Sequence, residues 1–159
     1  MPGISSRAQK TPLSPFRALI PVADAAKANG AHVYHLNIGQ PDIPTPPQAW
    51  RAVREDTQDI LAYSPAAGIM PYRRALVDYY RRFDIELTAE QILVTTGASE
   101  GLLFAMLCCL DEGDEVIIPE PFYANYNGFA HIANVKIKPV TCHLRDGFAL
   151  PAVEDFAAQ

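Results

Sequence analysis

Residues 92–119 contain the pattern that most constrains how this chain folds. The apolar run Ile92–Thr95 is followed by the small-residue turn Gly97-Ala98-Ser99, an apolar stretch over 100–110 and a second apolar run at 116–119. A strand, a tight turn, a helix and a strand with short connections form a βαβ unit. Continuous apolar strands are typical of a parallel sheet covered on both faces. The pattern therefore predicts an α/β fold with three αβα layers and a mostly parallel sheet.

The flanking sequence predicts further elements. Residues 1–13 are polar and aperiodic, which is typical of an arm. We expect helices over 15–29 (with an interruption at Pro21), 47–58, 71–83 and 123–133, strands over 32–37 and 135–141, and the start of a helix near 150. The pairs Arg73/Arg74 and Arg81/Arg82 are interpreted as the solvated face of their helix.

Composition excludes several classes of protein. The chain has 159 residues, 49% hydrophobic and 19% charged, with a net charge of −5. These values argue against disorder and against a surface that binds nucleic acid or an anionic membrane. The sequence has neither a membrane-spanning apolar run nor a secretory leader at its N-terminus, so we expect a cytoplasmic protein. Cys108, Cys109 and Cys142 are expected to be reduced core thiols, and the four histidines lack the pattern of a metal site.

The turn Gly97-Ala98-Ser99 is a candidate anion site. Small residues let a ligand approach the backbone, and the unpaired amides of a first helical turn favour negative charge. Ser99 can add a hydroxyl, or it can serve only as the helix N-cap. Such a turn resembles the dinucleotide turn of short-chain dehydrogenases. However, Leu103 stands where that pattern has glycine, and no tyrosine is followed four residues later by lysine.

A second resemblance rests on four blocks in register. The blocks are 36–42 followed by Pro44, 63–68 followed by 72–76, 97–100, and 111–119 followed by Pro121-Phe122-Tyr123. In this order and spacing they resemble the class I and II aminotransferases. Together they cover roughly residues 15 to 156.

The resemblance implies a cofactor and its contacts. Members of this family are fold type I homodimers that use pyridoxal 5'-phosphate. The segment matching Gly97-Ala98-Ser99 holds the cofactor phosphate through backbone N–H groups, and the residue matching Tyr123 stacks on the pyridine ring. The residue matching Tyr63 reaches the phosphate of the neighbouring subunit, and the residue matching Gly39 lies near the substrate carboxylate. Without the resemblance, Tyr123 is better interpreted as a core or surface tyrosine, and the alternatives are local packing for Tyr63 and a simple turn for Gly39.

The resemblance also implies what this stretch of sequence lacks. The family's Schiff-base lysine has no match among Lys10, Lys27, Lys136 and Lys138. We therefore expect residues 1–45 to be an arm and small-domain segment, and 46–159 to be the first part of the large domain of a longer protein. The expected reaction moves an amino group from an L-amino acid, aspartate in our best interpretation, to a 2-oxo acid. We expect this portion alone to be inactive. The alternative is a truncated, non-catalytic paralogue that binds a phosphate or a partner.

Overall fold

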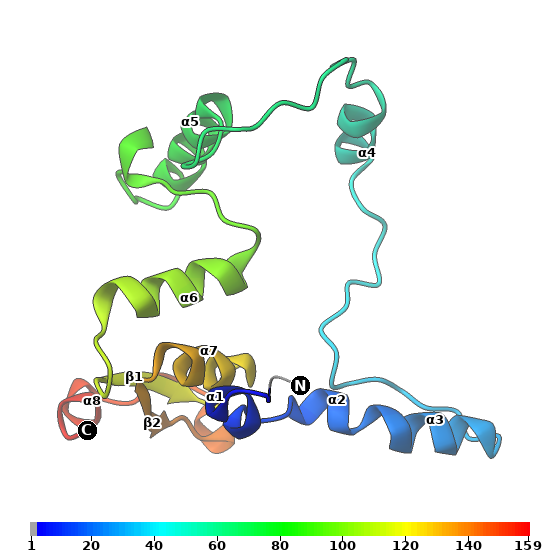
Figure 1. The fold of residues 1–159 in the computed structure, drawn as a ribbon, viewed down its shortest axis with the longest axis vertical. Coiled ribbons are helices and arrows are strands. Elements are labelled where there is room, and N and C mark those ends of the chain that lie inside the picture. Colours follow the sequence, from blue (N-terminus) through cyan, green and yellow to red (C-terminus); the bar gives the residue numbers. More distant parts are fainter. Residues whose placement is uncertain (1–2) are drawn as a thin grey trace. The chain divides into compact units, whose positions relative to one another are not determined.

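The computed structural model describes residues 3–159 (Figure 1). Its elements are α1 (Ser6–Lys10), α2 (Pro15–Ala18), α3 (Ile20–Ala28), α4 (Pro47–Arg54), α5 (Met70–Arg81), the 3₁₀ turn η1 (Ala89–Gln91), α6 (Ala98–Cys109), β1 (Glu115–Glu120), α7 (Asn125–Ala133), β2 (Lys136–Thr141), the 3₁₀ turn η2 (Leu144–Asp146) and α8 (Val153–Ala157). The described residues form two compact units. One consists of 3–37 with 97–159, and the other of 38–96.

A parallel βαβ motif forms the centre of the first unit. β1 and β2 pair in parallel, with Val116 opposite Ile137, and α7 is the crossover between them. The buried cluster consists of Met106 on α6, Ile118 on β1, Ala130 on α7 and Val135, which precedes β2. The predicted α/β class with a parallel sheet is confirmed, and so are the strands near 116–119 and 135–141.

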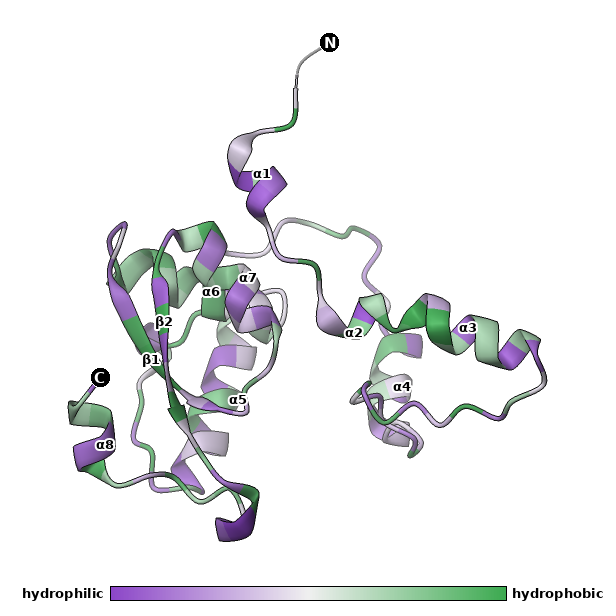
Figure 2. Ribbon diagram, turned by 90° about the horizontal axis from the view of Figure 1, so that it is seen from below, coloured by the Kyte–Doolittle hydropathy of each residue, from purple (hydrophilic) through white to green (hydrophobic). Residues whose placement is uncertain are grey.

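The helix α6 is apolar around its whole circumference. Its sequence, ASEGLLFAMLCC, has a single charged residue, and Figure 2 shows the helix mostly in the hydrophobic colour. Met106 faces the core, whereas Phe104 and Leu107 are exposed. A helix that is hydrophobic on all sides is typical of a position in which every face is covered.

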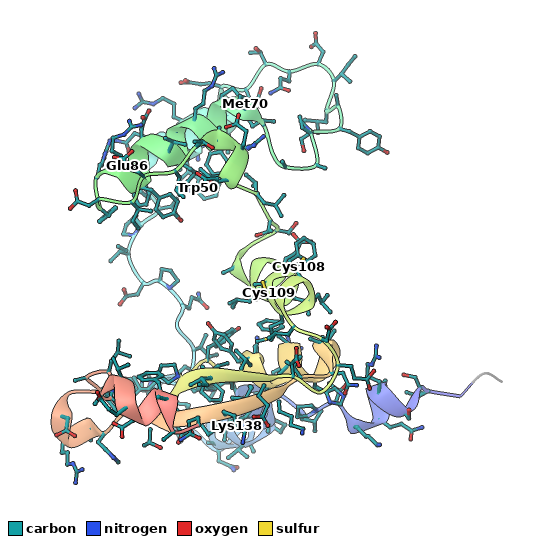
Figure 3. The ribbon with its side chains drawn as sticks, turned by 90° about the vertical axis from the view of Figure 1, so that its left-hand side faces the viewer. Trp50, Met70, Glu86, Cys108, Cys109 and Lys138 are labelled. Atoms are coloured by element: carbon teal, nitrogen blue, oxygen red, sulfur yellow. The ribbon has the colours of Figure 1, made fainter. Side chains whose placement is uncertain are left out.

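The prediction of core thiols is correct for one cysteine and wrong for two. All three thiols are free within the described residues. Cys142 is buried, whereas Cys108 and Cys109 are exposed on α6 (Figure 3). Both lie in the last turn of α6. The residue that α6 contributes to the buried cluster is Met106, not either cysteine.

Two predicted strands are wrong. Residues 32–37 and 92–95 are extended or turn-like, without ladder partners in the described chain. Ile92 is nevertheless buried, and the Val94 amide donates to the Ala67 carbonyl over 3.1 Å. The predicted interruption of the first helix is confirmed, because α2 ends at Ala18 and α3 begins at Ile20, next to Pro21.

Short-range ties organise the second unit. Ile92 is its one residue among the described buried hydrophobics, and Trp50 and Val53 of α4 are exposed. The Arg73 guanidinium on α5 donates through Nε to the Ala89 carbonyl over 2.8 Å, and its Nη2 donates to the same oxygen. Interpreting Arg73 as solvated was therefore wrong.

Within residues 3–159, no helix combines the length and the apolar character that crossing a bilayer requires.

Candidate functional site

The predicted anion turn lies at the start of α6. Gly97 is the N-cap, with φ +79° and ψ 169°. L-residues rarely adopt this positive φ, so the backbone conformation itself selects glycine. A Cβ built on Gly97 would meet nothing within 4 Å, so the outer side of the turn is open.

Ala98 and Ser99 are the first two residues of α6, and both are exposed. Ser99 therefore lies inside the helix, and the alternative in which it is the N-cap is wrong. Because the N-cap is glycine, no cap side chain covers the amides of the first turn. The partial positive charge at the start of this 12-residue helix favours an anion. Glu100, also in the first turn, is the one residue there whose charge opposes an anion.

Tyr123 lies in the connection between β1 and α7. Its side chain is half-exposed, and the Asn125 side-chain amide donates a 2.5 Å hydrogen bond to the Tyr123 hydroxyl. In Figure 1 the chain passes from the end of α6 to the start of β1, and the two elements run in opposite directions. The turn before α6 and the loop after β1 therefore lie at the same end of the α6–β1 pair, which is the end at which β1 has its carboxyl terminus. In parallel α/β layers, this carboxyl edge is where ligands bind.

Tyr63 and Gly39 belong to the other compact unit, 38–96. Tyr63 is fully exposed, and a Cβ built on Gly39 would meet nothing within 4 Å. Their roles beside a cofactor or substrate stay predictions.

Gly68 has a steric role that sequence reasoning did not assign. Its φ is +94°, and a built Cβ would lie 2.4 Å from Val94 Cγ2 and 2.6 Å from Val94 Cβ. Turning the valine side chain cannot relieve an overlap with its own Cβ, so the backbones at 68 and 94 approach closely only because residue 68 is glycine. The sequence signal was a glycine ending the small-residue run Pro65-Ala66-Ala67.

Electrostatics in the second unit centre on Glu90. A hydrogen bond from its own backbone amide and one from the Thr88 side chain lower the pKa of Glu90, and the nearby Arg73 and Arg74 charges act in the same direction. The capping box at η1 adds the Thr88 amide, which donates to Gln91 Oε1 over 2.8 Å. These hydrogen bonds lie within residues 88–91, and the bond from Arg73 to the Ala89 carbonyl joins η1 to α5, so the group has a structural role.

The lysines have structural positions in the described chain. Lys138 Nζ lies 3.6 Å from Glu115 Oε1, joining β2 to β1, and Figure 3 labels Lys138 on the strands. Lys10 and Lys27 lie in the last turns of α1 and α3, where a positive charge complements the helix dipole. None of these positions is the dry pocket that a catalytic lysine requires.

Comparison with known sequences identifies relatives over most of the chain. The family described as aminotransferase class I and II matches residues 31–154. An aspartate aminotransferase of Pyrococcus horikoshii is 39% identical over 116 residues, which are 72% of this chain and 29% of that protein. An LL-diaminopimelate aminotransferase of Desulforudis audaxviator is 38% identical over 136 residues, or 79% of this chain and 34% of that protein. The chain thus spans about a third of the length of these curated relatives.

Solved structures agree with the sequence comparison. The crystal structure of the aspartate aminotransferase from Thermotoga maritima superposes with a TM-score of 0.83 at 29% identity, covering 98% of this chain and 42% of that one. The Thermus thermophilus aspartate aminotransferase with maleate gives a TM-score of 0.82 at 30% identity, covering 99% and 42%. The fold is therefore that of the N-terminal portion of fold type I aminotransferases, and the chain belongs to the class I and II aminotransferase family.

Proposed function

We propose that this chain is the cofactor-cradling portion of a pyridoxal 5'-phosphate-dependent aminotransferase. The observation that carries the proposal is the Gly97 turn, with its positive φ and its open outer side at the start of α6, inside a chain of this family. Family membership favours this function over a nicotinamide-dependent dehydrogenase with a similar turn.

The residues at the turn fit the phosphate of such a cofactor. The amides of Ala98 and Ser99 supply donors at a helix start, and the Ser99 hydroxyl supplies another. Gly97 sets the turn conformation and leaves the approach clear. Residues 97–101 include neither lysine nor arginine, so amide and hydroxyl donors provide the binding, and the Glu100 carboxylate opposes it.

Tyr123 has the role of a flat surface for the cofactor ring. Its ring is half-exposed, while its hydroxyl is held by Asn125, so one ring face can be covered without breaking that contact. We assign Tyr63 to the phosphate of a neighbouring subunit and Gly39 to the vicinity of the substrate carboxylate. Both assignments rest on the resemblance and imply a homodimer.

When bound, pyridoxal 5'-phosphate supplies the electron sink for amino-group chemistry. The part of this chain described here binds the phosphate and orients the ring. The proton transfer at the substrate α-carbon requires a lysine in a dry site, and the described lysines do not fill that role. We therefore propose that these 159 residues alone do not transaminate.

The names of the relatives support an acidic substrate. Aspartate aminotransferases of Pyrococcus horikoshii and Thermotoga maritima and an aspartate/prephenate enzyme of Thermus thermophilus are among them. A glutamate-pyruvate aminotransferase of Escherichia coli and the LL-diaminopimelate enzyme widen the class. We propose an L-amino acid of aspartate type as the amino donor, a 2-oxo acid as the acceptor and a cytoplasmic location. Residues 1–45 would belong to the small domain and 46–159 to the large domain.

The test separates cofactor binding from catalysis. The purified chain is titrated with pyridoxal 5'-phosphate and, in parallel, with NAD, while tyrosine fluorescence reports binding. We expect saturable quenching by pyridoxal 5'-phosphate alone, weakened at least about tenfold by Gly97→Val, which disturbs the positive-φ turn. The exposed Gly3→Val is the matched control.

Catalysis is tested in two separate samples. With pyridoxal 5'-phosphate, aspartate and 2-oxoglutarate the chain should show no turnover. With pyridoxal 5'-phosphate alone, borohydride reduction should give no stoichiometric adduct at one lysine. Equal binding by both glycine variants would contradict the cradle, and turnover would contradict the inactive portion. A chain that binds neither compound would favour the non-catalytic paralogue.

A further inference from the structure

A hollow between α1 and the end of α7 collects positive charge. It has a volume of about 440 Å³ and is lined by Ser5, Ser6, Arg7, Lys10, His131 and Asn134. The two helices are tied together there, because His131 Nε2 lies 2.9 Å from the Arg7 carbonyl oxygen. All of these residues lie in the first compact unit, and none of them belongs to the Gly97 turn.

Helical spacing explains the charge. Arg7 and Lys10 are three residues apart on α1, so they lie on the same side of the helix. No carboxylate lines the hollow, and within residues 3–159 neither side chain forms an ion pair. Two full positive charges therefore face a common space with no internal counter-ion.

Neutral donors surround the two cations. The Ser5 hydroxyl oxygen accepts from the Ala8 amide over 3.2 Å, which leaves the hydroxyl hydrogen available to donate. Ser6 adds a second hydroxyl. The Asn134 amide donates one hydrogen to the Glu112 carboxylate and retains the other. Glu112 itself is not among the residues that line the hollow.

The end of α7 contributes an opposing but smaller effect. A helix C-terminus carries a partial negative charge of about half a unit. Here the Ala130 carbonyl accepts from the Val135 amide over 3.0 Å, and the His131 carbonyl accepts from the Asn134 amide over 3.3 Å. These bonds satisfy carbonyls that would otherwise face the hollow, so the two whole charges of Arg7 and Lys10 outweigh the helix end.

We infer that this hollow, named here the α1/α7 pocket, binds a phosphate-type oxyanion, either free or as a monoester. The guanidinium of Arg7 matches two oxygens of a tetrahedral anion, the Lys10 ammonium supplies a point charge, and the serine hydroxyls match the remaining oxygens. The inference does not depend on the proposed function, because it uses different residues and a different ligand contact.

Calorimetric titration of the 159-residue chain at constant ionic strength tests the pocket. Inorganic phosphate and glycerol phosphate are the two probes, and they separate a free anion from a monoester. Saturable binding of at least one probe is expected, and Arg7→Gln with Lys10→Gln should weaken it about tenfold or more, since charge-assisted hydrogen bonds are lost. Glutamine keeps the helix propensity of α1, and circular dichroism verifies that the helices persist.

The matched control removes the same charge elsewhere in the unit. Arg17→Gln with Lys27→Gln lies on α2 and α3, outside the pocket lining, and should change affinity less than about twofold, because distant exposed charges are screened. Absence of saturable binding by the unaltered chain, or equal weakening by both double variants, would overturn the inference. Weakening by Gly97→Val but not by the α1 pair would assign the anion to the Gly97 turn instead.

Discussion

The two compact units are stabilised by different kinds of contact. In the first, Met106, Ile118, Ala130 and Val135 form a buried apolar cluster that joins two helices and a strand. In the second, Ile92 is the buried hydrophobic residue, and polar ties and one glycine hold the segments together. Apolar burial is roughly additive over area, whereas a hydrogen bond to one carbonyl acts at a single point. Stability in the first unit is therefore shared over many atoms, and in the second it depends on a few.

The largest effect is expected from the core of the first unit. Ile118→Ala should lower the free energy of unfolding of that unit by about 3 kcal/mol through lost burial and a residual cavity. Hydrogen exchange of the whole chain, read peptide by peptide, should show lost protection in α6, β1 and α7 and unchanged protection in α5. Ile117→Ala, on the exposed face of the same strand, is the control and should cost about 1 kcal/mol or less. Equal loss in both units would mean that they unfold as one.

The next largest effect is expected at Gly68. Gly68→Ala should destabilise the second unit by about 2 to 3 kcal/mol, because overlap with Val94 adds to the cost of a positive φ. Gly30 has φ +84° with open space around it, so Gly30→Ala isolates the backbone cost of about 1 kcal/mol. Proteolysis within 60–96 measures the effect of Gly68→Ala, and proteolysis within 20–37, in the first unit, measures that of Gly30→Ala. If the two variants lose the same stability, the contact with Val94 contributes nothing.

A smaller effect separates two neighbouring arginines. Arg73→Gln should cost about 1.5 kcal/mol, because the Ala89 carbonyl loses a charged donor. Arg74→Gln, whose side chain is exposed, should stay within about 0.5 kcal/mol of the unaltered chain. Urea unfolding followed by exchange in α5 distinguishes them. Similar losses at both positions would return Arg73 to the solvated face.

The smallest effect is a pH dependence in the second unit. The pKa of Glu90 is lowered in the folded chain by hydrogen bonds to its own amide and to Thr88. Its stabilising contribution is therefore present above the unfolded pKa and is lost as pH falls through the folded pKa. Glu90→Gln should be slightly less stable than the unaltered chain near neutral pH, and the difference should shrink in acid. A difference that is constant with pH would exclude this carboxylate as its source.

Local patterns predicted helices better than strands. Pro47, the apolar period after Pro71, and the small-residue turn before α6 placed α4, α5 and α6 within a few residues, because caps and periodicity act locally. Residues 92–95 are as apolar as β1 but lack a ladder partner in the described chain, and pairing is a property of two segments.

The features of the candidate site and its surroundings also divide into those that local sequence predicts and those that depend on the fold. The Gly97 turn was predictable from glycine before an apolar helix. The contact of Arg73 with Ala89 and the approach of Gly68 to Val94 were not, because each joins segments whose separation only the fold sets. Tyr63 and Gly39 remain assigned by resemblance alone.

The close approach of Gly68 to Val94 couples the residue types that can be accepted at these two positions of the sequence. A residue with a side chain becomes acceptable at 68 only when residue 94 has no Cβ, and then only if the residue at 68 tolerates a left-handed backbone, as asparagine does. Orthologues or laboratory-selected variants that lose the glycine at 68 should thus carry glycine at 94, and a library randomised at both sites should recover a change at 68 only together with that change at 94.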